Sequence, residues 1–253
     1  PLLAKLGYRV WAPNLRGYGR SSRPAKIKDY HIDQLLADVA GLIDASGAKE
    51  TVLIAHDWGA IIAWLFAIKK VRPLSRLVIM NLPHPSCLQR EMRTTAQLRK
   101  SWYMFFFQLP WLPERMLMAR SAEAIGRAFT EMAVDKSRFP APVVQEYRQN
   151  AMQPGAMRAM INYYRAGMRA GSAMFPDPAR VEIPTLMIWG EEDTALGKAT
   201  TFGTEQYVPD LTLRYLPGVS HWVQQEAPEK VNAMLEAWLT NQPVPFEGEV
   251  ISG

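Results

Sequence analysis

The sequence predicts an α/β fold in which a mostly parallel sheet is flanked by helices and carries an inserted all-helical cap. Two observations predict it. Short β-branched and aliphatic runs alternate with helical periodicity in the first and last thirds of the chain, as is typical of parallel strands joined by right-handed crossovers. Between residues 87 and 180, Arg, Met and aromatic residues instead follow helical spacing, punctuated by prolines.

These patterns predict the elements in order. Before the insertion we expect a strand at 8–12, a glycine-rich loop at 14–22, a helix at 31–46, a strand at 51–55, a helix at 60–70 and a strand at 77–80. After it we expect a strand at 185–188, a helix near 201–207, a strand at 211–215 and a final helix at 228–239. The tail from Asn241 is expected to contribute little. The predicted core is therefore residues 1–86 and 181–253, and the predicted cap is 87–180.

Length and composition limit the class of protein. The 253 residues suit one large domain or a domain with an insertion, and 48% hydrophobic with 21% charged residues is ordinary for a globular chain. This excludes a disordered or low-complexity protein. A single cysteine, Cys87, excludes an internal disulfide framework and a cysteine-based zinc cluster, and the four histidines are scattered. Neither residue type therefore suggests a metal site.

The net charge of +5 is mild, but it is unevenly distributed. Residues 88–180 carry 14 Lys and Arg against 7 Asp and Glu. These basic residues do not interleave with aromatic residues as a nucleic-acid groove requires, so no nucleic-acid partner is expected. A solvated basic face is the simplest interpretation, and weak association with a membrane surface is the alternative.

The first residues resemble the end of a helix: Leu2, Leu3 and Leu6 precede Gly7, and the chain starts at Pro1 without a methionine. We therefore expect that the natural beginning lies upstream and that N-terminal strands of the sheet are missing. No secretory signal peptide opens the chain. A cytoplasmic location is the working expectation, although a missing segment could carry a signal or an anchor.

Asp57 is the first candidate catalytic residue. It follows the strand at 51–55, opens the next helix, and is flanked two positions away by the small residues Ala55 and Gly59. This is the arrangement of a nucleophile elbow, in which the backbone is tight and strained. A carboxylate at a helix N-terminus is stabilised as the anion and can attack an sp³ carbon to form an ester. An ordinary N-cap aspartate is the alternative.

Asp193 and His221 complete a candidate triad. Asp193 follows the strand at 185–188, and His221 follows the strand at 211–215. Both therefore belong to the sheet edge where α/β proteins place their sites. The chain order nucleophile, acid, histidine is that of the α/β-hydrolase triad.

The segments His56–Gly59, Trp189–Asp193 and Gly218–Trp222 resemble the epoxide hydrolase branch of the α/β-hydrolase superfamily, and the resemblance covers essentially the whole chain. The motif at 56–59 is shared with haloalkane dehalogenases, which use the same nucleophile. The family's upstream His-Gly-x-Pro loop, which supplies a second oxyanion N–H, is absent. Asn81 stands where some dehalogenases place the acid, and an amide cannot serve as a carboxylate.

The cap distinguishes the two activities. Epoxide opening expels an alkoxide, which leaves readily only when it is hydrogen-bonded or protonated, and family epoxide hydrolases use two cap tyrosines for this. The segments 101–110 and 162–165 resemble those that carry them, which implies Tyr103 and Tyr164. Helical spacing also favours Tyr164, which shares an apolar stripe, over Tyr163, which points about 100° away. Ordinary packing is the alternative for both.

The resemblance implies hydrolysis of a lipophilic epoxide to a vicinal diol. In that mechanism Asp57 forms an alkyl-enzyme ester, His221 oriented by Asp193 activates water, and Tyr103 and Tyr164 polarise the ring oxygen. Such a mechanism needs neither a metal nor an organic cofactor, so none is expected. The remaining candidates are the Trp58 backbone N–H as oxyanion donor and the substrate-lining residues Met104, Phe107 and Trp222. The expected partners are a small apolar epoxide and water, and a homodimer is left open. The alternatives are a haloalkane dehalogenase and a non-catalytic binding protein of the same fold.

Overall fold

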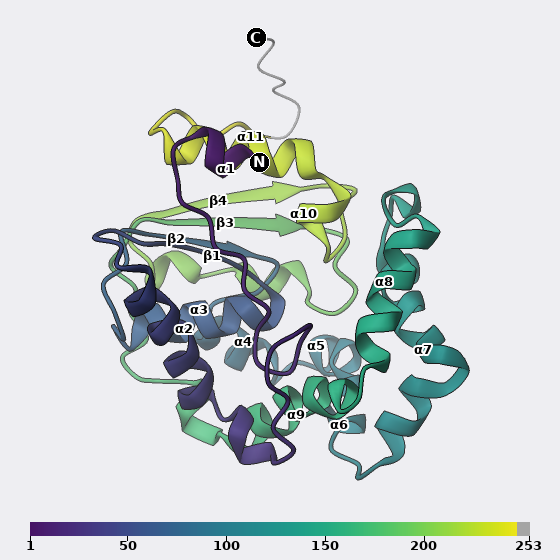
Figure 1. Cartoon of the computed structure of the whole chain (residues 1–253). Coiled ribbons are helices and arrows are strands. Elements are labelled where there is room, and N and C mark those ends of the chain that lie inside the picture. Colours follow the sequence, from purple (N-terminus) through teal and green to yellow (C-terminus); the bar gives the residue numbers. More distant parts are fainter. Residues whose placement is uncertain (247–253) are drawn as a thin grey trace.

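A four-stranded parallel sheet forms the centre of the protein in the computed structural model, which describes residues 1–246 (Figure 1). Its strands lie in the order β1 (Val52–His56), β2 (Arg76–Met80), β3 (Thr185–Gly190) and β4 (Leu211–Leu216). In register, His56 pairs with Met80, and Met80 with Ile188. Because all pairs are parallel, the residues that follow the four strands meet at one edge. The strands predicted from residue 51 onward are confirmed.

Helices cover both faces of this sheet (Figure 1). One face carries α2 (Ile32–Ser46), α3 (Asp57–Ile68) and α4 (Pro85–Glu91), and the other carries α1 (Leu2–Lys5), α10 (Val223–Glu226) and α11 (Pro228–Leu239). Helix α2 ends where the sequence predicts, because Gly47 adopts a left-handed φ of 62° that closes the helix. Helix α3 is buried on most of its surface, which explains its nearly continuous apolar sequence.

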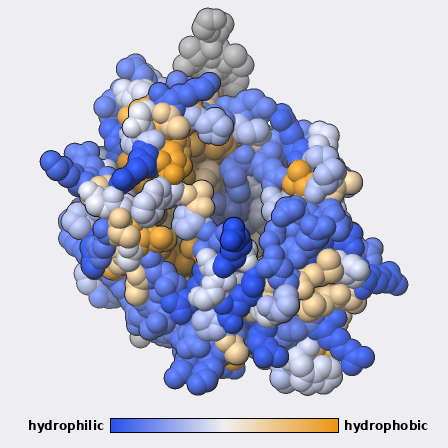
Figure 2. All heavy atoms as spheres, viewed as in Figure 1, coloured by the Kyte–Doolittle hydropathy of each residue, from blue (hydrophilic) through white to orange (hydrophobic). Residues whose placement is uncertain are grey.

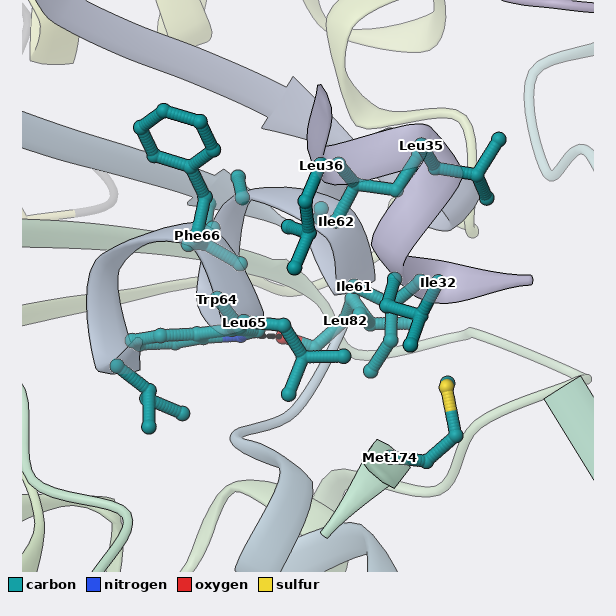
Figure 3. Packing of buried hydrophobic residues seen from close by; sticks show 14 of the residues in the cluster. Ile32, Leu35, Leu36, Ile61, Ile62, Trp64, Leu65, Phe66, Leu82 and Met174 are labelled. Atoms are coloured by element: carbon teal, nitrogen blue, oxygen red, sulfur yellow. Dashed lines mark hydrogen bonds between the residues drawn. The ribbon is translucent and has the colours of Figure 1, made fainter. Parts of the chain in front are cut away.

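The larger hydrophobic core lies between the sheet and α2 and α3 (Figure 3). Trp64, Leu65 and Phe66 are fully buried there, and each such side chain stabilises the fold by about 1.5–3 kcal/mol. The indole N–H of Trp64 donates to the carbonyl of Leu82 at 3.2 Å, so its polar atom is satisfied. A second core packs α11 against the opposite face of the sheet. The sheet is thereby fixed from both sides.

Between residues 92 and 180 the described elements are all helical. They are α5 (Thr95–Lys100), α6 (Trp102–Phe106), α7 (Leu112–Met132), α8 (Ala141–Met152) and α9 (Ala156–Arg169). Helix α7 is interrupted at residues 119–122, whose backbone angles are not helical. Short 3₁₀ turns occur at η1 (Ile27–Tyr30), η2 (Lys136–Arg138), η3 (Gly171–Met174), η4 (Lys198–Thr201) and η5 (Thr204–Gln206). The boundaries of core and cap stay a prediction.

Two predicted elements are wrong. Residues 8–12 do not form a strand, and Tyr8, Val10 and Trp11 are 37%, 47% and 49% exposed. In the described structure no strand pairs with this segment, and a β-prone sequence without a pairing partner gains no ladder hydrogen bonds. The helix expected near 201–207 is instead the pair of turns η4 and η5. Gly203, at φ 81°, breaks the helical path between them.

The tail contributes more than its sequence suggests, as far as residue 246. Val244 is buried, and its carbonyl accepts hydrogen bonds from the Arg214 guanidinium at 3.2 and 2.9 Å. Residues 247–253 lie outside the described part of the chain. Within that part, none of the helices combines the length and the apolar character needed to cross a membrane. The face seen in Figure 2 is mainly hydrophilic, with apolar residues gathered in patches.

Candidate active site

Asp57 lies directly after β1 as the first residue of α3. Its φ of 48° is in the left-handed region, which is strained for a residue other than glycine. The sequence suggests that a tight backbone requires small residues at 55 and 59. Gly59 is not crowded, however, because an added Cβ would have Ala55 Cβ as its nearest neighbour at 3.9 Å, an ordinary contact. The strain of the elbow is therefore in the backbone of Asp57 itself.

His221 lies between the candidate nucleophile Asp57 and the candidate acid Asp193. Its Nδ1 lies 2.7 Å from Oδ2 of Asp193, and its Nε2 lies 3.5 Å from Oδ1 of Asp57. The side chains of Asp193 and His221 are 0% and 5% exposed, whereas that of Asp57 is 38% exposed. The three predicted triad residues therefore come together, with the carboxylate of Asp57 at the accessible end.

The carboxylate of Asp193 is held at both oxygens. Oδ1 accepts hydrogen bonds from the N–H groups of Ala195 and Leu196 at 2.8 and 2.9 Å. Oδ2 accepts from Nδ2 of Asn81 at 2.8 Å as well as from His221. Asn81 follows β2 with a φ of 41°. Sequence reasoning noticed its position but missed its role as a hydrogen-bond donor to the acid.

The charges of the triad shift the pKa of each member. Burial alone would raise the pKa of Asp57, but the hydrogen bond and charge of His221 lower it to about 2. Burial alone would lower the pKa of His221, but Asp193 and Asp57 raise it to about 10. The two carboxylates therefore favour the imidazolium form of His221 in the free protein. Loss of the charge on Asp57 would lower the pKa of His221 and favour its neutral, basic form.

The loop that carries His221 is held against the sheet. Nε2 of His56 donates to the carbonyl of His221 at 2.9 Å, and burial lowers the pKa of His56 to about 4, so this ring is neutral at pH 7. At Gly190, an added Cβ would lie 2.1 Å from the carbonyl oxygen of Ser220. Only glycine permits that approach, which brings the ends of β3 and β4 together.

The two predicted cap tyrosines face each other. The rings of Tyr103 on α6 and Tyr164 on α9 are 5.7 Å apart in an edge-to-face arrangement. Burial and the negative charge of Asp57 raise the pKa of both hydroxyls, so both keep their protons near neutral pH. Tyr163 points away, as the helical spacing predicts, and its buried hydroxyl donates to the carbonyl of Arg16 at 2.6 Å.

A buried arginine holds the helices of the tyrosine pair together. Arg165 is 6% exposed and forms an ion pair with Glu114. Its guanidinium also donates to the carbonyls of Phe107 and Leu109, at 2.9 and 2.6 Å, at the end of the segment that carries Tyr103. Because Arg165 directly follows Tyr164, one side chain fixes the spacing of both tyrosines. Sequence reasoning missed this residue.

Comparisons with known proteins identify the family of this chain. A family model described as "alpha/beta hydrolase fold" matches residues 1–228. "Epoxide hydrolase 4" of Mus musculus is 36% identical over 244 residues, covering 94% of this chain and 67% of the relative. The crystal structure of Bacillus megaterium epoxide hydrolase in complex with an inhibitor superimposes with a TM-score of 0.82 at 31% identity, covering 89% of this chain and 82% of that one.

This chain belongs to the epoxide hydrolase branch of the α/β-hydrolase fold family. The fold class and the resemblance inferred from the sequence are thereby confirmed. The "AB hydrolase superfamily protein YfhM" of Bacillus subtilis is also 36% identical, over 95% of this chain and 83% of the relative. The chain spans 64% of the length of "Epoxide hydrolase 3" of Xenopus tropicalis.

Two of the predicted lining residues, Phe107 and Trp222, have their rings against candidate catalytic side chains. The ring of Phe107 is 4.9 Å from Tyr164, and that of Trp222 is 5.0 Å from His221. Trp58 lies edge-on to Tyr164 at 5.1 Å, and its backbone N–H hydrogen-bonds to the carboxyl of Asp57 and lowers its pKa. Met104, on α6, is half-buried. Apolar and aromatic walls of this kind suit an apolar ligand.

One further tyrosine belongs near this site. Burial raises the pKa of the Tyr18 hydroxyl, and the charge of Asp57 raises it further. The ring of Tyr18 packs edge-on against Tyr163 at 5.5 Å. Sequence reasoning placed Tyr18 in a glycine-rich loop and gave it no role. Among residues 1–246, no group of three or more His, Cys, Asp and Glu side chains is arranged to hold a metal ion.

Proposed function

We propose that this chain hydrolyses an apolar epoxide to a vicinal diol through an ester on Asp57. One observation carries the proposal: the accessible carboxylate of Asp57 contacts His221, and its charge also acts on the protonated pair Tyr103 and Tyr164. A nucleophile, a base and two proton donors thus lie within interaction range of one another. Epoxide opening requires all three.

In the first step, a carboxylate oxygen of Asp57 attacks one ring carbon of the epoxide. The bond between that carbon and the ring oxygen breaks as the ester bond forms. The developing alkoxide takes a proton from Tyr103 or Tyr164, leaving a tyrosinate. Burial keeps the pKa of both tyrosines high, but the charge on Asp57, which also raised them, disappears in the same step, so one cause that holds the proton is removed when a proton is needed.

In the second step, water attacks the carbonyl carbon of the ester. Because esterification removes the charge of Asp57, His221 first releases its extra proton to solvent, and it takes one up again when the carboxylate of Asp57 returns. Neutral His221, oriented by Asp193, then takes a proton from the attacking water, and the backbone N–H of Trp58 stabilises the oxyanion. The tetrahedral intermediate expels the alkoxide of the product, which takes the proton from His221. Asp57 is released as a carboxylic acid, and its proton returns to the tyrosinate. The sum is epoxide plus water giving a diol.

Alkyl halide hydrolysis is the second candidate, because it uses the same nucleophile. In the described structure, the buried indole nitrogen of Trp222 has no hydrogen-bond partner, and an indole N–H can bind a halide ion. Against this, halide release needs no proton donor, so the facing pair Tyr103 and Tyr164 would have no chemical role.

The deciding experiment supplies styrene oxide and, separately, a primary alkyl bromide, and measures diol and bromide release. We expect diol from the epoxide and little bromide release. The variant Asp57→Ala should abolish turnover because it removes the nucleophile. Bromide release without diol formation would support the second candidate. Absence of both products would favour a non-catalytic binding protein. The homodimer, the membrane association and the cytoplasmic location stay predictions.

A further inference from the structure

Glu226 is a buried carboxylate that the proposed reaction does not use. It ends α10 and is 4% exposed. Its Oε1 accepts hydrogen bonds from the backbone N–H groups of Val134 and Asp135, at 3.0 and 2.9 Å, just after α7 of the cap. Its Oε2 accepts from the N–H of Ser220 at 3.2 Å and from the hydroxyl of Ser220. One carboxylate thus binds the cap with one oxygen and the residue before His221 with the other.

Neighbouring contacts join the same two parts of the molecule. The hydroxyl of Tyr147 on α8 donates to Oε1 of Gln225 at 2.6 Å. Arg138 forms two hydrogen bonds to the carboxylate of Glu229, at 3.0 and 3.1 Å. These contacts involve residues that flank Glu226 in the chain, one position before it and three after it. Unlike Glu226, they are not bonded to the loop that carries the histidine.

We infer that Glu226 is a positioning residue that ties the placement of His221 to the seating of the cap. Ser220 is fully buried, and its backbone leads directly into His221. A change in the bonds of Glu226 is therefore transmitted to His221 through one peptide unit. The opposite side of His221 is held by the hydrogen bond from His56 to its carbonyl, so the loop is clamped from both flanks.

This inference rests on the proposed two-step reaction and predicts which step depends on Glu226. Ester formation uses Asp57 and the cap tyrosines, and His221 acts there only as a counter-ion. Ester hydrolysis requires Nε2 of His221 to reach a water molecule at the ester carbonyl. Because a small misplacement of a catalytic group can slow a step up to about a hundredfold, loss of the Glu226 bonds should slow hydrolysis selectively.

The test is rapid-quench mass spectrometry of the whole protein during turnover of styrene oxide, which follows ester formation and ester hydrolysis separately. The variant Glu226→Gln keeps the shape of the side chain but places an NH₂ group where N–H donors already point. We expect hydrolysis to slow by about tenfold or more while ester formation changes by less than about threefold, so that ester accumulates. The matched control is Glu229→Gln, which weakens the exposed pair with Arg138 without touching Ser220 and should leave both steps near wild type.

Each outcome decides the matter. Equal slowing of both steps, or no slowing, in folded Glu226→Gln overturns the inference, as does the same selective slowing in Glu229→Gln. If Glu226→Gln does not fold, Ser220→Ala takes its place, because it removes the hydroxyl bond to Glu226, together with a long one from the N–H of Trp222 at 3.4 Å, and keeps the bonds between Glu226 and the cap. Unchanged hydrolysis in Ser220→Ala then overturns the inference. A wild-type protein that forms no ester would overturn the proposed function, and the inference with it.

Discussion

Nδ2 of Asn81 lies 2.8 Å from Oδ2 of Asp193, the same oxygen that binds Nδ1 of His221 at 2.7 Å. Asn81 follows β2, and Asp193 follows the adjacent strand β3. The ends of two neighbouring strands therefore converge on one imidazole. The neutral amide after β2 directs the carboxylate after β3 without adding a second negative charge beside it.

Because Asn81 lies this close to Asp193, we predict that an aspartate at position 81 can replace the carboxylate of Asp193. Asp193→Asn should slow ester hydrolysis strongly, since replacing a triad aspartate by asparagine typically costs about 10⁴ in kcat. The double variant with Asn81→Asp added should form diol at least about ten times faster than Asp193→Asn, because a carboxylate then lies near the same ring nitrogen. Steady-state diol formation by the single and double variants is the measurement. A folded double variant no faster than Asp193→Asn would contradict the account.

The tyrosine pair should act on ring opening and not on hydrolysis. Replacing Tyr103 or Tyr164 by Phe removes one donor to the leaving oxygen, and loss of one such donor typically costs about 10²–10³ in rate. The double variant should form almost no ester, as measured by single-turnover mass spectrometry. Tyr163→Phe is the matched control, because its hydroxyl bonds the carbonyl of Arg16. That control should lose stability and keep the rate of ring opening; a slowed ring opening would contradict the assignment.

Arg165 should matter for both stability and ring opening. Arg165→Met leaves the half-buried Glu114 without its partner, and the loss of stability should stay below the roughly 3–5 kcal/mol that breaking a fully buried ion pair costs. It also frees the carbonyls of Phe107 and Leu109, so the spacing of the tyrosines should loosen. Urea unfolding and single-turnover ester formation measure the two effects. Arg158→Met, an exposed change on the same helix, should alter neither; equal effects of both variants would refute the role of Arg165.

His84 makes stability depend on pH. Its fully buried ring stacks on Tyr207 at 4.7 Å, and burial lowers its pKa to about 4. The unfolded chain, with a histidine pKa of about 6.5, binds the proton first as pH falls. The free energy of unfolding should therefore decrease between pH 6.5 and 4, by up to about 3 kcal/mol from this residue.

The variant His84→Phe keeps an aromatic ring against Tyr207 and removes the titrating group. Its loss of stability between pH 7 and pH 4.5, measured by urea unfolding, should be smaller than that of the wild type. His56, whose pKa burial also lowers to about 4, should leave part of the dependence in place. An identical decrease in both proteins would show that His84 does not contribute.

The triad could be predicted from the sequence because its signals are local. Asp57, Asp193 and His221 each follow a short apolar strand, and parallel strands bring such positions to one edge. Helical spacing likewise separated Tyr164 from Tyr163. The prediction of a strand at 8–12 was wrong because the composition of this segment favours a strand, while strand formation depends on a pairing partner that no local pattern reveals.

The supporting residues could not be predicted because their partners are distant in the chain. Asn81 binds a residue 112 positions away, and Glu226 binds the cap across 92 and 91 positions. A single Asn after a strand or a single Glu two residues before a Pro is equally compatible with an exposed side chain. Their roles follow only from burial and hydrogen bonding in the folded protein.

The ester on Asp57 is the central claim, and isotope labelling tests it most directly. The protein, in excess over styrene oxide, is allowed one turnover in ¹⁸O-labelled water, and the peptide that contains Asp57 and the diol are then weighed. If water attacks the ester carbonyl, one ¹⁸O atom enters the carboxylate of Asp57 and the diol is unlabelled. A labelled diol with an unlabelled peptide would mean that water attacks the epoxide directly, which would contradict the account.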